Sequence, residues 1–175
     1  MRLSYLLSAT ALSLSFCLPA SATTFAFGAT LSNVGEPNPT STGTGFAAVD
    51  FDDVLMQVSV NETFANLVNP ASAAHIHCCT TTAFTGSIGV ALGLASFPSA
   101  QSGNYVNTFT LTAAAFNSLL AGSQAGKAYL NIHSAAHPGG EIRGFLVPVP
   151  EPETYALMMA GLGLVGLAAR RRRAA

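Results

Sequence analysis

Short segments of β-forming residues, separated by turn residues, constrain this chain most strongly. Between residues 24 and 147, clusters of Gly, Pro, Asn and Thr interrupt runs rich in Val, Ile, Phe and Tyr. Strands at this spacing are typical of an all-β sandwich, in which two antiparallel sheets bury their inner faces against each other. We expect strands at residues 24–31, 45–51, 54–60, 87–92, 105–111, 128–133 and 141–147, with another extended segment around residue 75.

The third of these segments follows a period-two pattern. Its apolar side chains share one face, because successive side chains on a strand point in opposite directions. These side chains are Val54, Met56, Val58 and Val60. Together with residues 45–51 and a turn at residues 52–53, the segment predicts a hairpin, and residues 61–73 are predicted to be a connection.

One segment, at residues 112–122, breaks the strand pattern and predicts a short helix. Thr112 can cap its first turn and Gly122 can end it. Its apolar residues recur at i, i+3 and i+4, which places them on one helical face. They are Phe116, Leu119 and Leu120.

The first 22 residues have the pattern of a secretory signal peptide. Arg2 gives a basic start, an apolar run follows, and Ala20-Ser21-Ala22 forms an A-x-A cleavage site. We expect this N-terminal signal helix to be removed by cleavage after Ala22. The domain then extends over residues 23–147.

The C-terminal residues, 148–175, have the pattern of a membrane segment. An apolar run at residues 155–169 is followed by four arginines at residues 170–173. The run is slightly shorter than the ~17–25 residues that usually span a bilayer, but it has no polar face. Positive charge stays on the cytoplasmic side, so we expect a transmembrane helix with the domain outside.

This tail resembles the PEP-CTERM protein-sorting signal of exosortase-containing Gram-negative bacteria. The resemblance implies export by the general secretion route, transient anchoring in the inner membrane and processing by an exosortase. It also implies delivery to the cell envelope or the extracellular space, and a link to exopolysaccharide or biofilm. The sorting residues are Pro150, Glu151, Pro152, Arg170, Arg171, Arg172 and Arg173.

Between its two ends the chain carries few charges and is mildly acidic. Lys127 and Arg143 are the basic residues of residues 23–147, against six acidic ones. Two cations cannot form the basic stripe that nucleic acid binding requires, so that class of partner is excluded. The sequence also offers no Ser-His-Asp arrangement, phosphate-binding glycine loop or catalytic carboxylate pair, so we predict a non-enzymatic domain.

Two histidine-bearing segments carry most of the chemistry. His75 and His77 lie at i and i+2, so on a strand they point to the same face. If the strand that bears His133 is adjacent, the three rings can form a cluster that suits zinc or copper. The alternative is that these histidines only hydrogen-bond within the fold. His137, in a loop, is predicted to be exposed to solvent rather than a ligand.

The adjacent residues Cys78 and Cys79 are the only cysteines of the predicted mature domain. In an exported protein, thiols tend to be oxidised. Three states remain open: a vicinal disulfide, disulfides to another chain, or soft ligands beside the histidines. We favour the vicinal disulfide.

Glu141 and Arg143 also lie at i and i+2. Arginine forms bidentate pairs with carboxylates, so we predict a structural ion pair of Arg143 with Glu141 or with an acid earlier in the chain.

The domain resembles the CHRD family, which is named from chordin. The resemblance rests on Phe27-Gly28-Ala29-Thr30-Leu31 with Glu36-Pro37, on Ala74-His75-Ile76-His77, and on residues 128–133 leading into Pro138-Gly139-Gly140-Glu141-Ile142-Arg143-Gly144. It implies an immunoglobulin-like β-sandwich. Where the family commonly has glycine after A-H-I-H, this chain has Cys78-Cys79.

Three functions are consistent with these features. The first is a secreted, non-enzymatic matrix protein that binds a polysaccharide or another protein. The second is a zinc- or copper-binding protein or a redox protein, centred on His75, His77 and His133. The third, an enzyme that modifies exopolysaccharide, requires an acidic cleft that the sequence does not reveal.

Overall fold

The computed structural model of the protein describes residues 24–36, 40–150, 158–162, 164–165 and 170. The predicted signal peptide and most of the predicted sorting residues, apart from Pro150 and Arg170, lie outside this range. The predicted membrane helix at residues 155–169 lies only partly inside it. Within the described residues, no helix has the length and apolar character needed to cross a bilayer.

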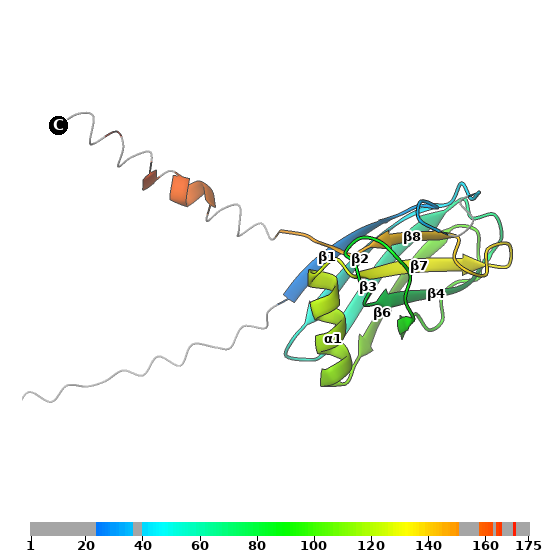
Figure 1. The fold of residues 1–175 in the computed structure, drawn as a ribbon, viewed down its shortest axis with the longest axis horizontal. Coiled ribbons are helices and arrows are strands. Elements are labelled where there is room, and N and C mark those ends of the chain that lie inside the picture. The colour runs from blue at the N-terminus through cyan, green and yellow to red at the C-terminus, as the bar shows by residue number, and fades with distance from the viewer. Residues whose placement is uncertain (1–23, 37–39, 151–157, 163, 166–169, 171–175) are drawn as a thin grey trace, which may run out of the picture.

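Two antiparallel sheets pack face to face in the domain (Figure 1), and the predicted all-β sandwich with one short helix is confirmed. The larger sheet has the order β6-β3-β2-β1-β9. Its strands are β6 (Gly103–Thr110), β3 (Gln57–Ala65), β2 (Thr44–Asp52), β1 (Thr24–Leu31) and β9 (Val147–Pro148). The smaller sheet has the order β5-β4-β7-β8. Its strands are β5 (Val90–Gly93), β4 (Ala71–Cys78), β7 (Ala128–Ser134) and β8 (Ile142–Phe145).

The hairpin of β2 and β3 is present, but β3 lies later in the chain than predicted. Residues 53–56 form the turn, and Val54 is exposed there rather than part of an inward face. Asp52 explains the shift, because its carboxylate accepts hydrogen bonds from the backbone N–H groups of Val54 and Leu55 and so fixes the turn. The prediction that residues 61–73 form a connection is therefore wrong, since β3 continues to Ala65 and β4 begins at Ala71.

Alternating side chains of both sheets fill the core. On β2, Ala47, Val49 and Phe51 are all buried, while the residues between them face outward. Phe51 makes edge-to-face contacts with Phe27 of β1 and Phe116 of the helix, at centroid distances of 5.4 and 5.7 Å. Burying one such ring contributes roughly 1.5–3 kcal/mol to stability.

The helix α1 (Ala113–Gln124) packs against the core from the side (Figure 1). The side chain of Thr112 accepts a hydrogen bond from the backbone N–H of Ala115, as predicted for the capping residue. Phe116 and Leu119 are buried, so the predicted apolar face is the one that packs.

The two sheets meet where β1 runs beside β8. Ser32 and Arg143 exchange backbone hydrogen bonds of 3.1 and 2.8 Å. Next to this bridge, the backbone of Thr30 lies so close to Gly144 that a Cβ there would collide with it. Glycine at this position therefore lets β8 approach β1 closely.

Candidate metal centre

The three predicted ligands converge on the outer face of the smaller sheet. Ala74 and Ile76 of β4 are buried in the core, so His75 and His77 point outward. In the antiparallel pairing with β7, Ala73 lies opposite His133, which sets His133 diagonally from His75. One side-chain nitrogen from each of the three histidines lies within 4.8 Å of the others, and Nδ1 of His75 is 3.1 Å from Nε2 of His133.

Backbone carbonyls orient two of these rings. The Nδ1–H group of His77 donates to the carbonyl of Ile88 at 2.7 Å, and that of His133 donates to Pro138 at 2.9 Å. A neutral imidazole with its proton on Nδ1 has its lone pair on Nε2. Histidine ligands of metals typically have this arrangement, with a carbonyl fixing the tautomer from behind.

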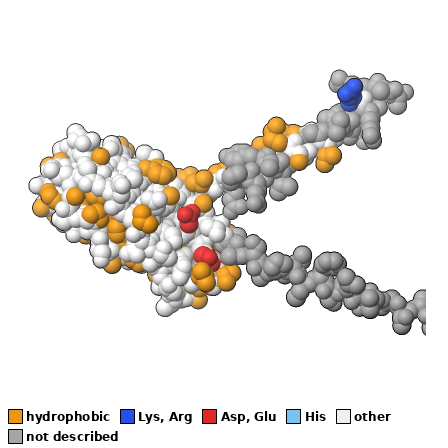
Figure 2. Space-filling view, turned by 180° about the vertical axis from the view of Figure 1, so that it is seen from behind, with side chains coloured by type: hydrophobic (Ala, Val, Ile, Leu, Met, Phe, Trp, Pro, Cys, Tyr) orange, Lys and Arg blue, Asp and Glu red, His pale blue; other side chains and the backbone are white. Residues whose placement is uncertain are grey.

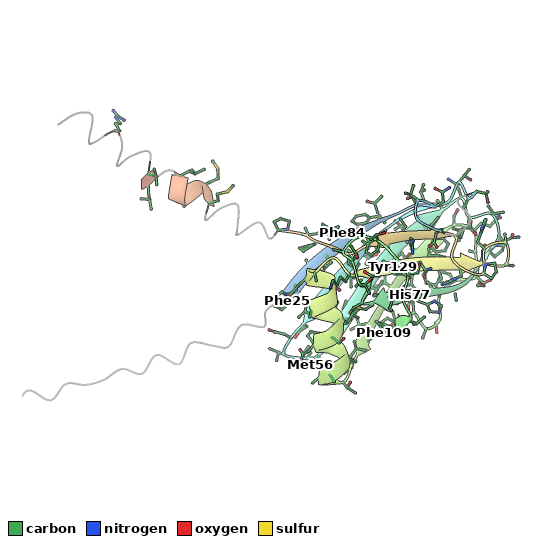
Figure 3. The ribbon with its side chains drawn as sticks, viewed as in Figure 1. Phe25, Met56, His77, Phe84, Phe109 and Tyr129 are labelled. Atoms are coloured by element: carbon green, nitrogen blue, oxygen red, sulfur yellow. A yellow bond between two sulfur atoms is a disulfide. The ribbon has the colours of Figure 1, made fainter. Side chains whose placement is uncertain are left out.

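His77 is the most enclosed of the three rings. It stacks in parallel on Tyr129, with centroids 4.8 Å apart (Figure 3), and the guanidinium of Arg143 lies over the Tyr129 ring at 5.0 Å. Nε2 of His77 is 3.1 Å from Oδ1 of Asn131, an acceptor, so this contact favours a proton on Nε2 rather than the lone pair that a metal requires. A metal bound to Nε2 would displace Asn131 from that position.

Burial lowers the pKa of His75, and the neighbouring His133 and His77 lower it further. Burial also lowers the pKa of His133, with repulsion from His77 acting in the same direction and the hydrogen bond to Pro138 opposing it. Both rings are therefore neutral at lower pH than a free histidine would be. The neutral imidazole is the form that binds a metal ion.

Cys78 and Cys79, directly after His77, form a disulfide with each other. The sulfurs lie against α1, where Sγ of Cys79 is 3.6 Å from the carbonyl of Ser118. Gly122 faces both sulfurs so closely that any side chain there would overlap them. In this state the cysteines offer no thiolate to a metal, and the disulfide packs the end of β4 against the helix.

Glu141 and Arg143, predicted to form an ion pair, have separate partners. The carboxylate of Glu141, which is fully buried, accepts hydrogen bonds from the hydroxyls of Ser41 and Ser134 and from the backbone N–H of Val68. Arg143 instead donates to the carbonyl of Gly86 and to Ser87. The predicted Glu141–Arg143 pair is therefore corrected: Glu141 joins two loops to the end of β7, and Arg143 lies over the Tyr129 ring.

Two further buried groups, Glu36 and Asn131, lie next to this centre. Burial raises the pKa of Glu36, while the charge of Arg143, a hydrogen bond with Asn131 and the charge of His137 lower it. Arg143 thus acts on Glu36 through its charge, while Oε1 of Glu36 has no hydrogen-bond partner among the described residues. Asn131 could have been found from the sequence, because it lies two residues before His133 and so shares its strand face.

The expectation that His137 is exposed to solvent is wrong. Its turn folds back on β7, with hydrogen bonds between the backbone N–H of His137 and the carbonyl of Ser134 and between the N–H of Gly140 and the carbonyl of His137. His137 is therefore buried, and its Nδ1 has no hydrogen-bond partner among the described residues.

Comparison with protein families gives two matches that follow each other along the chain. The family model described as the CHRD domain matches residues 27–146, and the PEP-CTERM protein-sorting motif matches residues 148–173. Both resemblances predicted from the sequence are thus confirmed. Searches of curated proteins and of solved structures give no match.

Proposed function

The chain belongs to the CHRD domain family and ends in a PEP-CTERM sorting motif, and from this premise we propose that it is a non-enzymatic protein of the extracellular matrix. The motif marks an exported protein that an exosortase recognises and that is processed at the membrane. We propose that the domain, once outside the inner membrane, binds or organises exopolysaccharide or a matrix protein, as in a biofilm.

One observation carries this proposal. The CHRD match ends at residue 146 and the sorting motif begins at residue 148, so the domain is the cargo that the motif delivers. The two sheets and the helix bury one continuous core, so the delivered cargo is one folded domain. The mildly acidic domain has no basic surface for nucleic acid.

Replacing the sorting residues should trap the protein at the membrane. In the triple variant Pro150→Ala/Glu151→Ala/Pro152→Ala, we expect the unprocessed chain to accumulate in the inner-membrane fraction, because the exosortase no longer recognises the tail. Immunoblotting of membrane, periplasmic and extracellular fractions measures this, with Glu153→Ala as the neighbouring control. Processing of the triple variant at the rate of the unaltered chain would contradict delivery of the domain through these sorting residues.

A second candidate function, metal binding, is favoured by the convergence of His75, His77 and His133. Three imidazole nitrogens can hold zinc or copper and leave a coordination position open. The carbonyl behind His133 would hold that ring in the ligating tautomer, whereas His77 would also have to release the amide oxygen of Asn131. With an open position, copper would allow redox chemistry and zinc would allow activation of bound water.

We expect the chain purified from the periplasm to carry zinc or copper near one equivalent, and the double variant His75→Gln/His77→Gln to carry none. Loss of two ligands should weaken binding more than about 100-fold, since loss of an outer hydrogen-bond partner alone costs about 10–100-fold. Elemental analysis and metal titration measure this. His137→Gln is the matched control, because it removes a histidine outside the cluster.

Equal metal content in the double variant and the control would exclude the cluster as the site. If the unaltered chain, the double variant and the control all stayed metal-free after titration with zinc and copper, the histidines would have a structural role only. Circular dichroism establishes that each variant is folded.

A further inference from the structure

A surface groove runs beside the strand that leads to the sorting tail. Two adjoining hollows form it, with volumes of about 530 and 280 Å³, and they share Thr30, Phe84 and Phe145. We call the larger hollow the tail groove. Its apolar side chains come from β2, from β8, from the loop before β5 and from the C-terminal strand. They are Phe46, Phe84, Phe145, Val147, Pro148, Val149 and Pro150.

The exposed aromatic rings of the tail groove are held in place. The side chain of Phe84 is 58% exposed. Its backbone φ of 58° lies in the left-handed region, which costs energy for a residue with a side chain. Its N–H donates to the carbonyl of Gly126 at 2.7 Å, its ring covers Gly126, and it meets Phe145 edge to face at 6.1 Å. The fold therefore fixes Phe84 in an exposed position rather than burying it.

The tail groove lies where the chain leaves the domain, and hydrophobic side chains are visible beside that exit (Figure 2). The backbone N–H of Val149 donates to the carbonyl of Ala26, which attaches this last stretch to β1. The apolar run of the tail begins at residue 155, five residues beyond Pro150. Five residues reach at most about 18 Å, so an anchored domain must hold the tail groove close to the bilayer surface.

The chemistry of the lining favours lipid over sugar. Thr30 is the one polar side chain that lines the tail groove, and no charged side chain lines it. A sugar ring requires several hydrogen-bonding groups for its hydroxyls, whereas the interface of a bilayer accepts Phe and Val side chains without them. An exposed apolar patch of this kind marks an interaction surface.

We propose that the tail groove rests on the outer leaflet of the inner membrane while the chain is anchored, with Phe46 and Phe84 inserted among the lipids. This rests on the membrane anchoring in the proposed function. The contact holds Pro150 and the sorting residues that follow it at the bilayer surface, where processing takes place. Because no charged side chain lines the groove, the contact does not depend on anionic lipid or on low salt.

The absence of tryptophan from the chain makes a direct test possible. Full-length Phe46→Trp is reconstituted into phosphatidylcholine vesicles with or without brominated acyl chains, which quench tryptophan only on contact. Val90→Trp is the control, because Val90 is similarly exposed, at 53%, and lies on the edge strand β5 of the other sheet. Val147→Trp is a second reporter in the groove. Flotation in a density gradient measures anchoring independently.

We expect brominated lipid to lower the emission of both groove reporters at least twofold, at low and high salt, and to leave the Val90→Trp control unchanged. Vesicles that carry the protein but quench the groove reporters no more than the control would overturn the groove contact and leave the anchoring intact. Protein that fails to float with the vesicles would overturn both. A groove reporter could instead be unquenched and blue-shifted, with emission that depends on the ratio of protein to lipid. That result would assign the groove to a second copy of the chain and overturn the lipid contact.

Discussion

Replacing Glu62 by glutamine is expected to stabilise the domain by roughly 3 kcal/mol at pH 7 and by about 5 kcal/mol above pH 8. Glu62 lies on the inward face of β3 between Val60 and Phe64, and its side chain is 0% exposed. Neither carboxyl oxygen has a hydrogen-bond partner among the described residues. Burial raises the pKa of Glu62 from 4.5 to about 8, so the native state keeps this group protonated.

The register explains why Glu62 has no partner. Its cross-strand neighbours are Ala47 on β2 and Tyr105 on β6. Alanine offers no hydrogen bond, and the hydroxyl of Tyr105 already donates to the carbonyl of Ala95 at 2.8 Å. A buried carboxyl without a partner loses its hydrogen bonds to water and forms none in the protein, so its burial destabilises the native state.

The direction of the pH dependence follows from the raised pKa. Between pH 4.5 and about 8 the unfolded chain releases the proton of Glu62 while the native state retains it. The native state therefore binds more protons, and stability falls as pH rises, by about 1.4 kcal/mol per unit. The loss begins above pH 4.5 and is complete near pH 8. Glutamine does not titrate, so the variant avoids it.

Urea unfolding of both proteins between pH 4 and pH 9 measures the effect. The difference in free energy of unfolding should be near zero at pH 4 and should grow with pH, because a protonated glutamate and a glutamine are similar in size and polarity. The slope of free energy against urea should be unchanged, since both proteins bury the same surface. A difference that is independent of pH would contradict a protonated native Glu62.

Glu62 also explains where sequence reasoning failed in the fold. Alternating apolar residues predict a strand, and a glutamate at an inward position interrupts that alternation after Val60. In the turn before β3, Val54 and Met56 extend the alternation where no strand exists. The apolar pattern thus shifted the predicted strand toward the N-terminus. By contrast, α1 combines its cap with helical spacing in one short segment, so the predicted residues 112–122 cover most of it, although the helix continues past Gly122 to Gln124.

The candidate metal centre was predictable only in its strand residues. His75 and His77 follow period two within one segment, and the pairing of β4 with β7 brings in His133. Glu36 and His137 come from loops that fold over the same end of the sheet. Their positions depend on contacts between distant parts of the chain, which local patterns do not encode.

The same substitution at Glu141 is expected to have the opposite effect, a loss of roughly 2–4 kcal/mol. Glu141 is as fully buried as Glu62, but three donors converge on its carboxylate. They are the hydroxyl of Ser41 at 2.7 Å, the backbone N–H of Val68 at 2.6 Å and the hydroxyl of Ser134. A glutamine amide would turn an N–H₂ group toward one or more of these donors and leave them unpaired.

Glu141→Gln should therefore lower the urea midpoint at pH 7, while Glu62→Gln raises it, and each variant is the control for the other. Ser41→Ala and Ser134→Ala remove one donor each, so their effects should be smaller and should not add to that of Glu141→Gln. Loosening of the loops around Ser41, Val68 and Ser134 should appear as faster hydrogen exchange there than in β2. If both glutamine variants shifted stability in the same direction, burial rather than hydrogen bonding would decide the contribution of each glutamate.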